Sequence, residues 1–549
     1  MAARRSDKSE TQSVNVAPPH FLAVSVFKRI IESLRGQGGA KWVARKPPTR
    51  FRQDPVPHLP RSRAIAFVRV LLRIFFRRIE VAGRENIPLE GGGIFVAWHP
   101  NGLIDPALLL AECPRPIMVG ARHGLFSWPL LGPLMRSLGA VPVYRAVDAT
   151  PGPAPDSMRS DKNRQSLDAL ATRLASGELT ALFPEGVSHD APHLVELKTG
   201  AAKLFTQALS LRKAGDALPA ILPVGLHYDE KNVFRSRALV VFHPPLVLSE
   251  ALTAPLPEAA DTATRRARYA AITRDIEAEL RNVVHATESW ELHALMHRIR
   301  RLFRAERAKR AGAQLVEPDM QEREAGYARV WAGFEANRHS APEATAALTA
   351  RVAKYDDALR ALGLDDEDLD RGPTLHGGPL PLIAVTQALT MMLFFPPLLL
   401  AGFVANVIPY QLIRLISAVG AKLKKDAATV KAVSGAVLFP LSWAAFAWFA
   451  TSGAIALHET YRGFPRTPVT AALFALAFAV FGGALLLRYQ EFLKEAWRSL
   501  RVRLTRYRYR TAIEKLRDER SGLFDALSAM VKGVHLPGEV GIDGRVLPP

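Results

Sequence analysis

Cysteine is nearly absent from this sequence: Cys113 is the single cysteine among 549 residues. One thiol excludes an intrachain disulfide and a metal site built from several thiolates. Because Cys113 lies in an apolar run, we expect a buried structural thiol rather than a nucleophile. A cleavable signal peptide is not expected, since the first residues are polar and the first apolar stretch is short and interrupted by charge.

Nucleic-acid-binding motifs are also lacking, because the sequence shows no zinc-finger spacing, no RNP-like segment and no basic heptad zipper. The net charge of +20 therefore suggests a different acidic partner, anionic lipid or phosphorylated substrates. Arginine and lysine crowd the flanks of apolar segments, as in residues 69–78 and 421–431, which is typical of proteins at a membrane surface. We expect anionic membrane lipids as partners and no nucleic acid.

Changes in composition divide the chain into five regions. The first is polar and is expected to be disordered or interfacial. The second alternates short apolar runs with turn signals, as an α/β domain does, and the third is an accessory region rich in Ala, Arg and Glu at helical spacing. The fourth is strongly apolar, and the fifth is helical and basic. The expected bounds are 1–63, 64–250, 251–375, 379–488 and 489–549.

The α/β domain opens with residues 64–81, an apolar segment that holds four arginines. We expect a helix lying in the membrane interface with its arginines reaching the headgroups, or an ordinary helix that enters the domain. A loop with proline and glycine, residues 148–161, interrupts the middle of the domain. Strands are expected at Gly93–Trp98, Pro116–Ala121, Ala140–Tyr144, Leu179–Pro184, Ala220–Leu226 and Ala238–Phe242.

The apolar region contains two segments long enough to cross a bilayer, residues 432–457 and 469–487, since a span needs about 20 residues. Residues 380–413 are almost uncharged but are broken in the middle by two prolines. Loop 414–431 and the tail are basic, so the positive-inside rule places both in the cytoplasm. We therefore expect a hairpin of two spans, a re-entrant segment or tight helical hairpin at 380–413, and a cytoplasmic catalytic domain. Three plain spans are the alternative.

A histidine and a carboxylate follow the first of these predicted strands. His99 comes directly after Trp98, and Asp105 follows after five intervening residues. Such a pair suits a general base and the group that orients it. On an ideal helix the two side chains would lie on different faces, so Pro100-Asn101-Gly102 must form a turn. Asp105 has an alternative role as the N-cap of a helix that starts at Pro106.

Further polar residues follow the other strands. Arg145, Lys198, Arg235 and Arg237 are candidate phosphate binders, because guanidinium and ammonium groups pair with phosphate oxygens. Glu185 and Gly186 end the strand segment Phe183-Pro184, and glycine lets the backbone approach a ligand closely. A solvated surface position is the alternative for each of these residues taken singly.

Taken in order, His99-x5-Asp105, Arg145, FPEG and PVG resemble the four sequence blocks of the glycerophospholipid acyltransferase family, over about residues 64–250. The segments WHPNGLIDP, FPEGVSHD, LKTGAAK and FRSRALVVF are similar to those of the fungal-type glycerol-3-phosphate/dihydroxyacetone-phosphate acyltransferases, which also carry membrane segments after the catalytic domain. The usual first block has four residues between histidine and aspartate, and the five found here agree with the fungal-type branch. The third block has Val187-Ser188-His189 where an arginine or lysine often follows FPEG.

This resemblance implies an α/β acyltransferase domain with a mixed sheet flanked by helices, followed by a helical region and C-terminal transmembrane helices. It implies transfer of a fatty acyl group from a coenzyme A or acyl-carrier-protein thioester to glycerol 3-phosphate or 1-acyl-glycerol 3-phosphate, without a cofactor. Another lysophospholipid acceptor, or an inactive lipid-binding membrane protein, are the alternatives. The implied catalytic residues are His99 and Asp105, and the implied substrate-binding residues are Arg145, Glu185, Gly186, Ser188, Lys198, Arg235 and Arg237.

An enzyme nucleophile is not needed for this chemistry, because the substrate's own hydroxyl attacks the thioester. The sequence has no G-x-S-x-G motif that would supply one. A metal is not expected either, because the remaining histidines of the domain lack the spacing of metal ligands. These histidines are His189, His193, His227 and His243.

Overall fold

The structure is a computed structural model that describes residues 60–128, 131–143, 156–213, 215–257, 259–313, 315–370, 396–420 and 427–548, with the single positions 386, 389 and 393. Structural statements below concern these residues. The predictions for the N-terminal segment 1–59 lie outside them, as do Tyr144 and Arg145.

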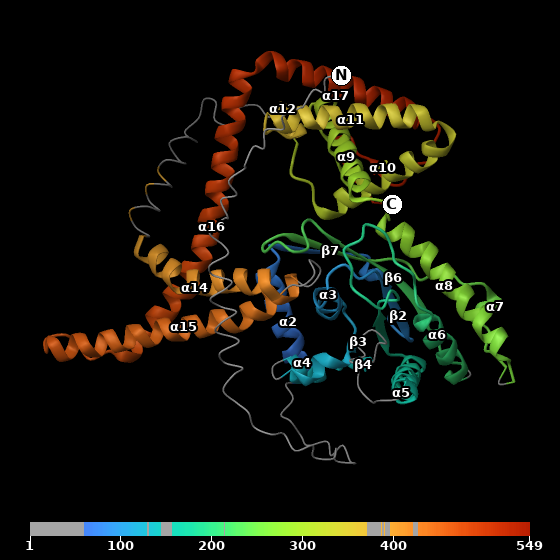
Figure 1. The fold of residues 1–549 in the computed structure, drawn as a ribbon, viewed down its shortest axis with the longest axis horizontal. Coiled ribbons are helices and arrows are strands. Elements are labelled where there is room, and N and C mark those ends of the chain that lie inside the picture. Colours follow the sequence, from blue (N-terminus) through green and yellow to red (C-terminus); the bar gives the residue numbers. More distant parts are fainter. Residues whose placement is uncertain are drawn as a thin grey trace, which may run out of the picture. The chain divides into compact units, whose positions relative to one another are not determined.

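A seven-stranded sheet forms the centre of the α/β domain, with strand order β1-β7-β6-β2-β5-β3-β4 (Figure 1). All neighbouring strands are parallel except β6 and β7, which are antiparallel. The predicted mixed sheet is confirmed, and each predicted strand is found within a few residues of its expected bounds. The strands are β1 (Arg78–Ala82), β2 (Gly93–Ala97), β3 (Ile117–Arg122), β4 (Val141–Val143), β5 (Leu179–Leu182), β6 (Ala220–Tyr228) and β7 (Arg237–Phe242).

The prediction of a single helix over residues 64–81 is wrong at its C-terminal end. Helix α2 (Arg61–Phe75) ends early, and β1 follows as an edge strand parallel to β7. A short apolar run is compatible with a helix or a strand, so its pattern does not place the boundary. The helix buries Ala64 and Leu72 against the domain and leaves Phe67 and Val70 exposed on its other side.

Helices cover both faces of the sheet. After α2, the first helices along the chain are the short helix η1 (Arg84–Asn86), α3 (Ile104–Glu112), η2 (His123–Ser127) and α4 (Leu131–Ser137). The remaining helices of the domain are α5 (Asp156–Ala175), α6 (Gly200–Leu211), α7 (Glu250–Thr253) and α8 (Thr262–Val284).

Strand β2 is buried on both of its faces. Phe95 and Ala97 join a core cluster with α2 and α3, while Ile94 and Val96 join a second cluster with α5, α6 and α8. Successive side chains of a strand point to opposite faces, so a strand covered on both sides must be apolar throughout. Polar chemistry can therefore begin only where β2 ends, and His99 stands two residues beyond that end.

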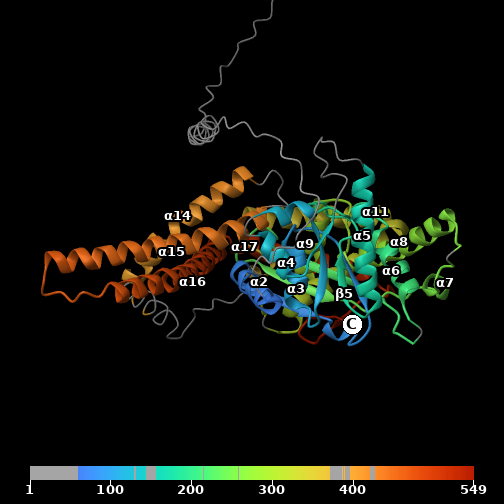
Figure 2. The same cartoon turned by 90° about the horizontal axis from the view of Figure 1, so that it is seen from below.

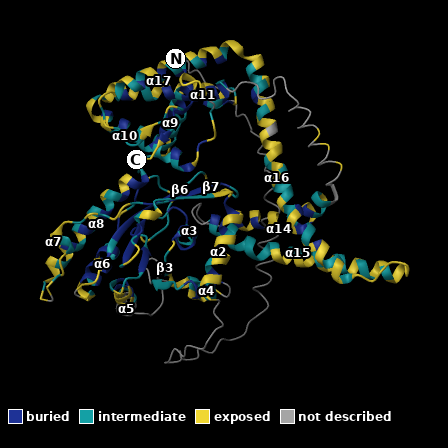
Figure 3. Cartoon of the chain, turned by 180° about the vertical axis from the view of Figure 1, so that it is seen from behind, coloured by how far each residue is buried: buried dark blue, intermediate teal, exposed yellow. Residues whose placement is uncertain are grey.

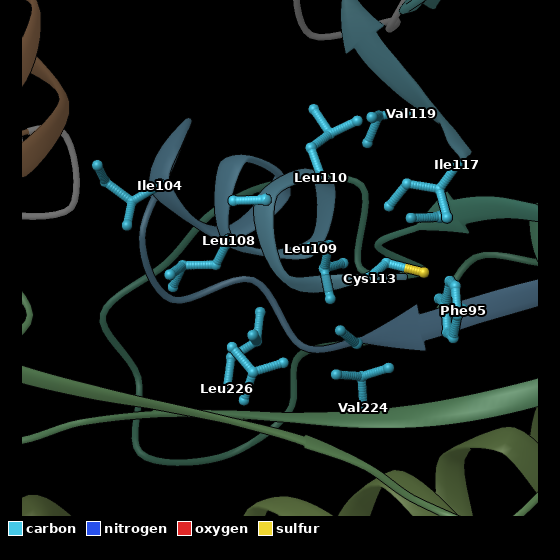
Figure 4. Close-up of a cluster of buried hydrophobic side chains, with 14 of the residues drawn as sticks. Phe95, Ile104, Leu108, Leu109, Leu110, Cys113, Ile117, Val119, Val224 and Leu226 are labelled. Atoms are coloured by element: carbon cyan, nitrogen blue, oxygen red, sulfur yellow. The ribbon is translucent and has the colours of Figure 1, made fainter. Parts of the chain in front are cut away.

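Cys113 lies in the first of these clusters, next to Leu109 and Ile117 (Figure 4). Its side chain is 5% exposed, and burial raises the pKa of the thiol above its ordinary value. A raised pKa leaves little thiolate at neutral pH, so the expected burial of an unreactive thiol is confirmed.

A second group of helices, after the α/β domain, packs around its own core. The members are α9 (Trp290–Arg310), α10 (Met320–Ser340), α11 (Pro342–Ala361), α12 (Asp366–Asp370) and α17 (Arg510–Met530), with the short strands β8 (Glu539–Val540) and β9 (Val546–Leu547). Helix α17 thus shares a core with helices about two hundred residues earlier in the chain. Arg520 on α17 is fully buried and its guanidinium pairs with Glu306 on α9, at 2.9 Å, and with Asp370 on α12.

Three long helices form the apolar part of the chain: α14 (Pro396–Gly420), α15 (Ala427–Thr460) and α16 (Pro468–Arg508). Within the described residues, three segments are long and apolar enough to cross a membrane: Leu398–Ala418, Ala427–Thr460 and Pro468–Arg508. Few of their residues are buried (Figure 3), and the helices lie side by side (Figure 2). These features support membrane association.

Small and polar residues join the three apolar helices. The backbones of Gly402 and Gly482 approach so closely that a side chain would not fit between them. Asn406 donates a hydrogen bond to the carbonyl oxygen of Ala479 at 2.9 Å and accepts one from the indole of Trp443 at 2.9 Å. Such contacts are typical of helix association in membranes. Residues 380–395 lie almost wholly outside the described residues, so the re-entrant segment at 380–413 stays a prediction.

A cluster of histidines lies between the α/β domain and the helical core. His227 of β6 pairs with Glu324 of α10 at 3.1 Å. On α9, the Nε2 atoms of His293 and His297 are 3.2 Å apart, and His293 Nδ1 lies 2.9 Å from the hydroxyl of Tyr327. Burial lowers the pKa of His297 to about 3, against the opposite effect of Glu324.

This cluster makes the fold sensitive to acid. His297 is neutral in the folded protein, whereas in the unfolded chain it takes up a proton as the pH falls below about 6.5. Stability is thus fully present above that pH and is lost as the pH falls from about 6.5 toward 3, by on the order of 1 kcal/mol for this residue at pH 5.5. We expect the full-length protein in detergent to melt at a lower temperature at pH 5.5 than at pH 7.5. The difference should be smaller in His297→Gln; an unchanged difference would contradict this assignment.

Candidate active site

The turn after β2 brings His99 and Asp105 together. His99 Nδ1 lies 2.8 Å from Asp105 Oδ2, and the side chains are 17% and 0% exposed. Gly102 within the turn has a φ of +38°, a conformation that favours glycine. Helix α3 starts at Ile104, so Asp105 is its second residue, and the N-cap prediction for Asp105 is wrong. The turn forms because the carboxylate accepts a hydrogen bond from the backbone N–H of Asn101 at 2.7 Å.

Asp105 also accepts a hydrogen bond from the hydroxyl of Tyr228 at 2.5 Å. Burial, and then the charge of Asp105, raise the pKa of Tyr228 well above its ordinary value, so the hydroxyl stays protonated and donates. The carboxylate is therefore held by the imidazole, a backbone N–H and a phenol. With a carboxylate at Nδ1, that nitrogen carries the proton and Nε2 is left as the basic atom.

Tyr228→Phe removes one of the three donors to Asp105 and keeps the ring. We expect kcat for acyl transfer to fall about tenfold, because hydrogen bonds to charged groups contribute about 1.5–3 kcal/mol and two donors remain. Steady-state kinetics of the purified protein measures this. Tyr269→Phe, on α8, is the matched control and should keep its activity. A Tyr228→Phe protein with unchanged kcat would contradict the orienting role of the phenol.

Glu185 is buried and contacts the backbone of His99. Its Oε2 accepts a hydrogen bond from the backbone N–H of His99 at 2.8 Å. Its Oε1 lies 2.6 Å from Nε2 of His189 and accepts a hydrogen bond from the backbone N–H of Val195 at 3.2 Å. The backbone N–H of His189 donates in turn to the carbonyl oxygen of His99 at 3.1 Å. The FPEG segment thus fixes the backbone of the turn that carries His99.

Phe183 and Lys231 complete the surroundings of the turn. The ring of Phe183 stacks on His99, with centroids 4.2 Å apart and planes at 21°. Lys231 Nζ donates to the carbonyl oxygen of Pro100 at 2.9 Å and pairs with Asp190 at 2.5 Å. Phe183 therefore contacts the imidazole of His99, and Lys231 holds the backbone of the turn at Pro100.

The predicted phosphate binders lie in different surroundings. Gly186 has a φ of +70° and follows Glu185 directly, and Ser188 lies in the same loop. Lys198 Nζ pairs with the exposed Glu196 at 2.9 Å, while its backbone N–H donates to the carbonyl oxygen of Pro184 at 2.7 Å. Lys198 is thus anchored to the FPEG turn with its side chain in solvent. Arg145 lies outside the described residues.

Arg235 and Arg237 have carboxylate partners within the protein. Arg235 pairs with Glu491 on α16 at 3.2 Å. Arg237 is 7% exposed and pairs with Asp229 at 2.6 Å. The structure thus joins His99, Asp105 and Glu185 in one hydrogen-bonded site, while the contacts of these two arginines lead to other parts of the chain.

The apolar helix α15 contacts the turn between His99 and Asp105 directly. The backbone N–H of Leu103 donates to the hydroxyl of Thr429 on α15 at 3.2 Å. Ala428 is fully buried in the core cluster that contains α3, and Lys431 donates to the carbonyl oxygen of Asn232 at 2.7 Å. The first turn of α15 is therefore part of the packing around the site.

Sequence reasoning missed Tyr228, Asn101, His189 and Lys231. Tyr228 and Lys231 follow the PVG block within GLHYDEK, and a signal for Tyr228 was its place near the end of an apolar strand. Its partner Asp105 is 123 residues away in the chain, so only the pairing of β6 beside β2 reveals the contact.

Comparison with known proteins gives a match over the same part of the chain. Residues 78–227 match the family described as Acyltransferase. An uncharacterised acyltransferase of Schizosaccharomyces pombe is 25% identical over 256 residues, which cover 32% of this chain and 37% of that protein. Glycerol-3-phosphate O-acyltransferase 1 of Saccharomyces cerevisiae is 29% identical over 195 residues, covering 35% of this chain and 24% of the yeast protein.

Two bacterial proteins are also similar. The lyso-ornithine lipid O-acyltransferase of Rhizobium meliloti is 28% identical over 144 residues, covering 26% of this chain and 42% of that protein. The crystal structure of the 1-acyl-sn-glycerophosphate acyltransferase of Thermotoga maritima has a TM-score of 0.26 and 17% identity, covering 40% of this chain and 79% of that one. The chain spans less than half the length of each of the three curated relatives named here. The matched residues 78–227 hold His99, Asp105 and Glu185 and resemble the acyltransferase family.

Proposed function

We propose that this chain is a membrane-bound enzyme that transfers a fatty acyl group from an acyl thioester to the hydroxyl of glycerol 3-phosphate or 1-acyl-glycerol 3-phosphate. The observation that carries the proposal is the pair of His99 and Asp105, 2.8 Å apart, at the end of β2 within the acyltransferase-family segment. The likeness to a yeast glycerol-3-phosphate acyltransferase supports the choice of acceptor.

In the proposed reaction, His99 Nε2 takes the proton from the acceptor hydroxyl as its oxygen attacks the thioester carbonyl. Asp105 holds the imidazole in place and stabilises the imidazolium that forms. The tetrahedral intermediate collapses by breaking the carbon–sulfur bond, and the imidazolium returns the proton to the departing thiolate. The products are an ester and a free thiol, so His99 ends in its starting state.

The acceptor phosphate needs cationic or N–H donors near this turn. Arg145, Ser188, Lys198 and the backbone at Gly186 are the proposed donors, with Glu185 bracing the loop that carries them. A phosphate that bound Arg235 or Arg237 would have to compete with the carboxylates that they already hold.

The apolar helices support a place in the membrane. Three segments are long and apolar enough to cross it, and α15 packs against the catalytic turn through Ala428 and Thr429. This packing would keep the site close to the bilayer that receives a lipid product. With a re-entrant segment at 380–413, which leaves two spans, the basic loop and tail support a cytoplasmic catalytic domain.

A second candidate acceptor is another lysolipid. The likeness to a lyso-ornithine lipid O-acyltransferase favours it, because the name of that protein gives an acceptor without glycerol phosphate. Such an acceptor would use the same histidine and aspartate, and would not need the proposed phosphate donors.

An acceptor assay tests the proposal. Purified membranes that contain the protein are given labelled palmitoyl-CoA with glycerol 3-phosphate, dihydroxyacetone phosphate, 1-acyl-glycerol 3-phosphate or lyso-ornithine lipid, and the labelled lipids are identified by mass spectrometry. Membranes with His99→Ala give the background. We expect label in lysophosphatidic or phosphatidic acid. Label in none of these products above the background, with either a coenzyme A or an acyl-carrier-protein donor, would overturn the proposal.

A further inference from the structure

A cavity of about 300 Å³ lies inside the helical core. Its walls come from α9, α10, α11, the end of α17 and the residues that follow α17. None of the lining residues belongs to the acyltransferase-family segment 78–227 or to the three apolar helices. The proposed acyl transfer therefore gives this cavity no role.

One wall of the cavity is cationic. Arg300, Arg304 and Arg307 line it from α9, and their spacing of four and three residues puts them on one face of that helix. Arg329 lines it from α10. Glu322 is the one carboxylate among the lining residues, and it forms an ion pair with Arg304. The lining therefore carries an excess of positive charge.

The other three arginines have no carboxylate within 4.0 Å in the described part of the chain. Arg300 is 8% exposed, and its Nε is buried without a hydrogen-bond partner among the described residues. Arg329 Nη1 donates to the carbonyl oxygens of Leu536, Pro537 and Gly538, while its Nε is likewise unpartnered there. Burial and then nearby arginines lower the pKa of Arg307 to about 10, so it stays charged at neutral pH.

Charges of one sign gathered in a partly buried place repel one another, and this repulsion is relieved when an opposite charge joins them. Guanidinium groups prefer carboxylate and phosphate, which they bind through two parallel N–H donors. Arg300, Arg307 and Arg329 thus form a cationic wall, and none of the three is in ion-pair contact with a carboxylate of the described residues.

Another part of the lining is apolar. Phe334, Leu348, Leu527 and Val531 line it from α10, α11, α17 and the end of that helix. The cavity is closed on α10 by glycine: a Cβ at Gly333 would lie 2.8 Å from the Cγ1 of Val531. A Cβ there would require the side chain of Val531 to shift, so α10 and the segment after α17 pack closely at this point.

The volume also suits a ligand. It stands at the small end of the range typical of small-molecule sites, about 300–1,000 Å³. It equals the space of about ten water molecules, and an apolar wall of this kind offers water few hydrogen bonds. A single alkyl chain is the chemical group that matches a narrow apolar space beside a cationic wall.

We propose that this cavity binds an anionic amphiphile, a molecule with one alkyl chain and a carboxylate or phosphate head. The head lies against Arg300, Arg307 and Arg329, and the chain lies between Phe334, Leu348 and Leu527. A free fatty acid and a monoacyl phosphate share this chemistry. This site is separate from the proposed acyl transfer and stands whether or not that proposal holds.

Photo-crosslinking of the full-length protein in phosphatidylcholine nanodiscs tests the site. The probes are dodecanoate, dodecyl phosphate and dodecyltrimethylammonium, each with a diazirine near the end of the alkyl chain, and labelled residues are mapped by mass spectrometry. We expect the two anionic probes to label residues within 299–349 and 527–546, and the cationic probe to label them far less. The anionic probe that labels at the lower concentration distinguishes a fatty acid from a monoacyl phosphate.

Two variants test separately the contacts of the ligand's anionic head group and of its alkyl chain. Arg307→Gln should lower the labelling by about tenfold, since a hydrogen bond to a charged group contributes about 1.5–3 kcal/mol. Leu348→Trp should lower it by filling the cavity. Arg351→Gln is the matched control, since Arg351 lies on the same helix as Leu348 and the change removes only an exposed ion pair with Glu519. This variant should label as the parent does.

Labelling found only in residues 78–227 or 396–508 would overturn the proposal. Equal labelling by the cationic and anionic probes would also overturn it. This comparison uses the parent protein alone, so it holds even if a variant fails to fold. Variants that melt as the parent does and still label fully would exclude the assigned arginine and leucine, and with them the site.

Discussion

His99→Ala lowers the rate of acyl transfer by about 10²–10⁴-fold, the usual contribution of a positioned general base. In the proposed mechanism the loss falls on kcat, because the imidazole acts when the hydroxyl proton leaves and Asp105 stabilises the imidazolium that forms at that moment. The acyl thioester and the acceptor still bind. The rate is measured in membranes that contain the protein, with labelled palmitoyl-CoA and the acceptor that the acceptor assay identifies.

The matched control is His193→Ala, the same substitution at an exposed histidine of the loop that follows FPEG. It should keep the parent's rate, and both variants should remain in the membrane fraction, because the apolar helices are unchanged. Since His99 and Asp105 act as one unit, the double variant with Asp105→Asn should be little slower than His99→Ala alone. Full activity in His99→Ala would exclude the proposed mechanism.

The sequence was most informative where the residues that act together lie close along the chain. His99 and Asp105 are six positions apart, and Pro100-Asn101-Gly102 between them are turn formers, so their meeting could be predicted. The strands of the sheet could be predicted because each is a short apolar run bounded by turn residues. Edge strand β1 could not, because it continues the apolar run of α2 without a break in composition.

Contacts between distant parts of the chain could not be predicted. Tyr228 reaches Asp105 because β6 lies next to β2, an order of strands that no local pattern states. Arg520 on α17 is buried against Glu306 on α9, although the tail reads as a solvated basic helix. A charged residue in a helix gives the same sequence signal whether it is solvated or paired, so pairing needs the fold.

For Glu185, the sequence predicted a role in the site but could not predict its contacts. A carboxylate after a strand reads as a group that meets the substrate. The structure turns it inward, where it accepts hydrogen bonds from the backbone N–H groups of His99 and Val195 and lies 2.6 Å from His189 Nε2. Its effect on the reaction would thus pass through the position of His99.

Glu185→Gln should therefore slow acyl transfer by about 10- to 100-fold. An amide keeps the shape of the carboxylate but replaces one accepting oxygen by a donating NH₂ group. In either orientation the NH₂ faces a backbone N–H, that of His99 or that of Val195, and a buried donor left without an acceptor costs about 1–3 kcal/mol.

The kinetic constants tell a positioning role from a binding role. If Glu185 holds the turn, kcat falls and KM for the acceptor changes little, because the carboxylate does not touch the acceptor. If it binds the substrate, KM rises and kcat is kept. Glu178→Gln, an exposed carboxylate paired with Arg173 just before β5, is the matched control and should leave both constants unchanged. A rise in KM alone would place Glu185 at the substrate and remove it from the support of His99.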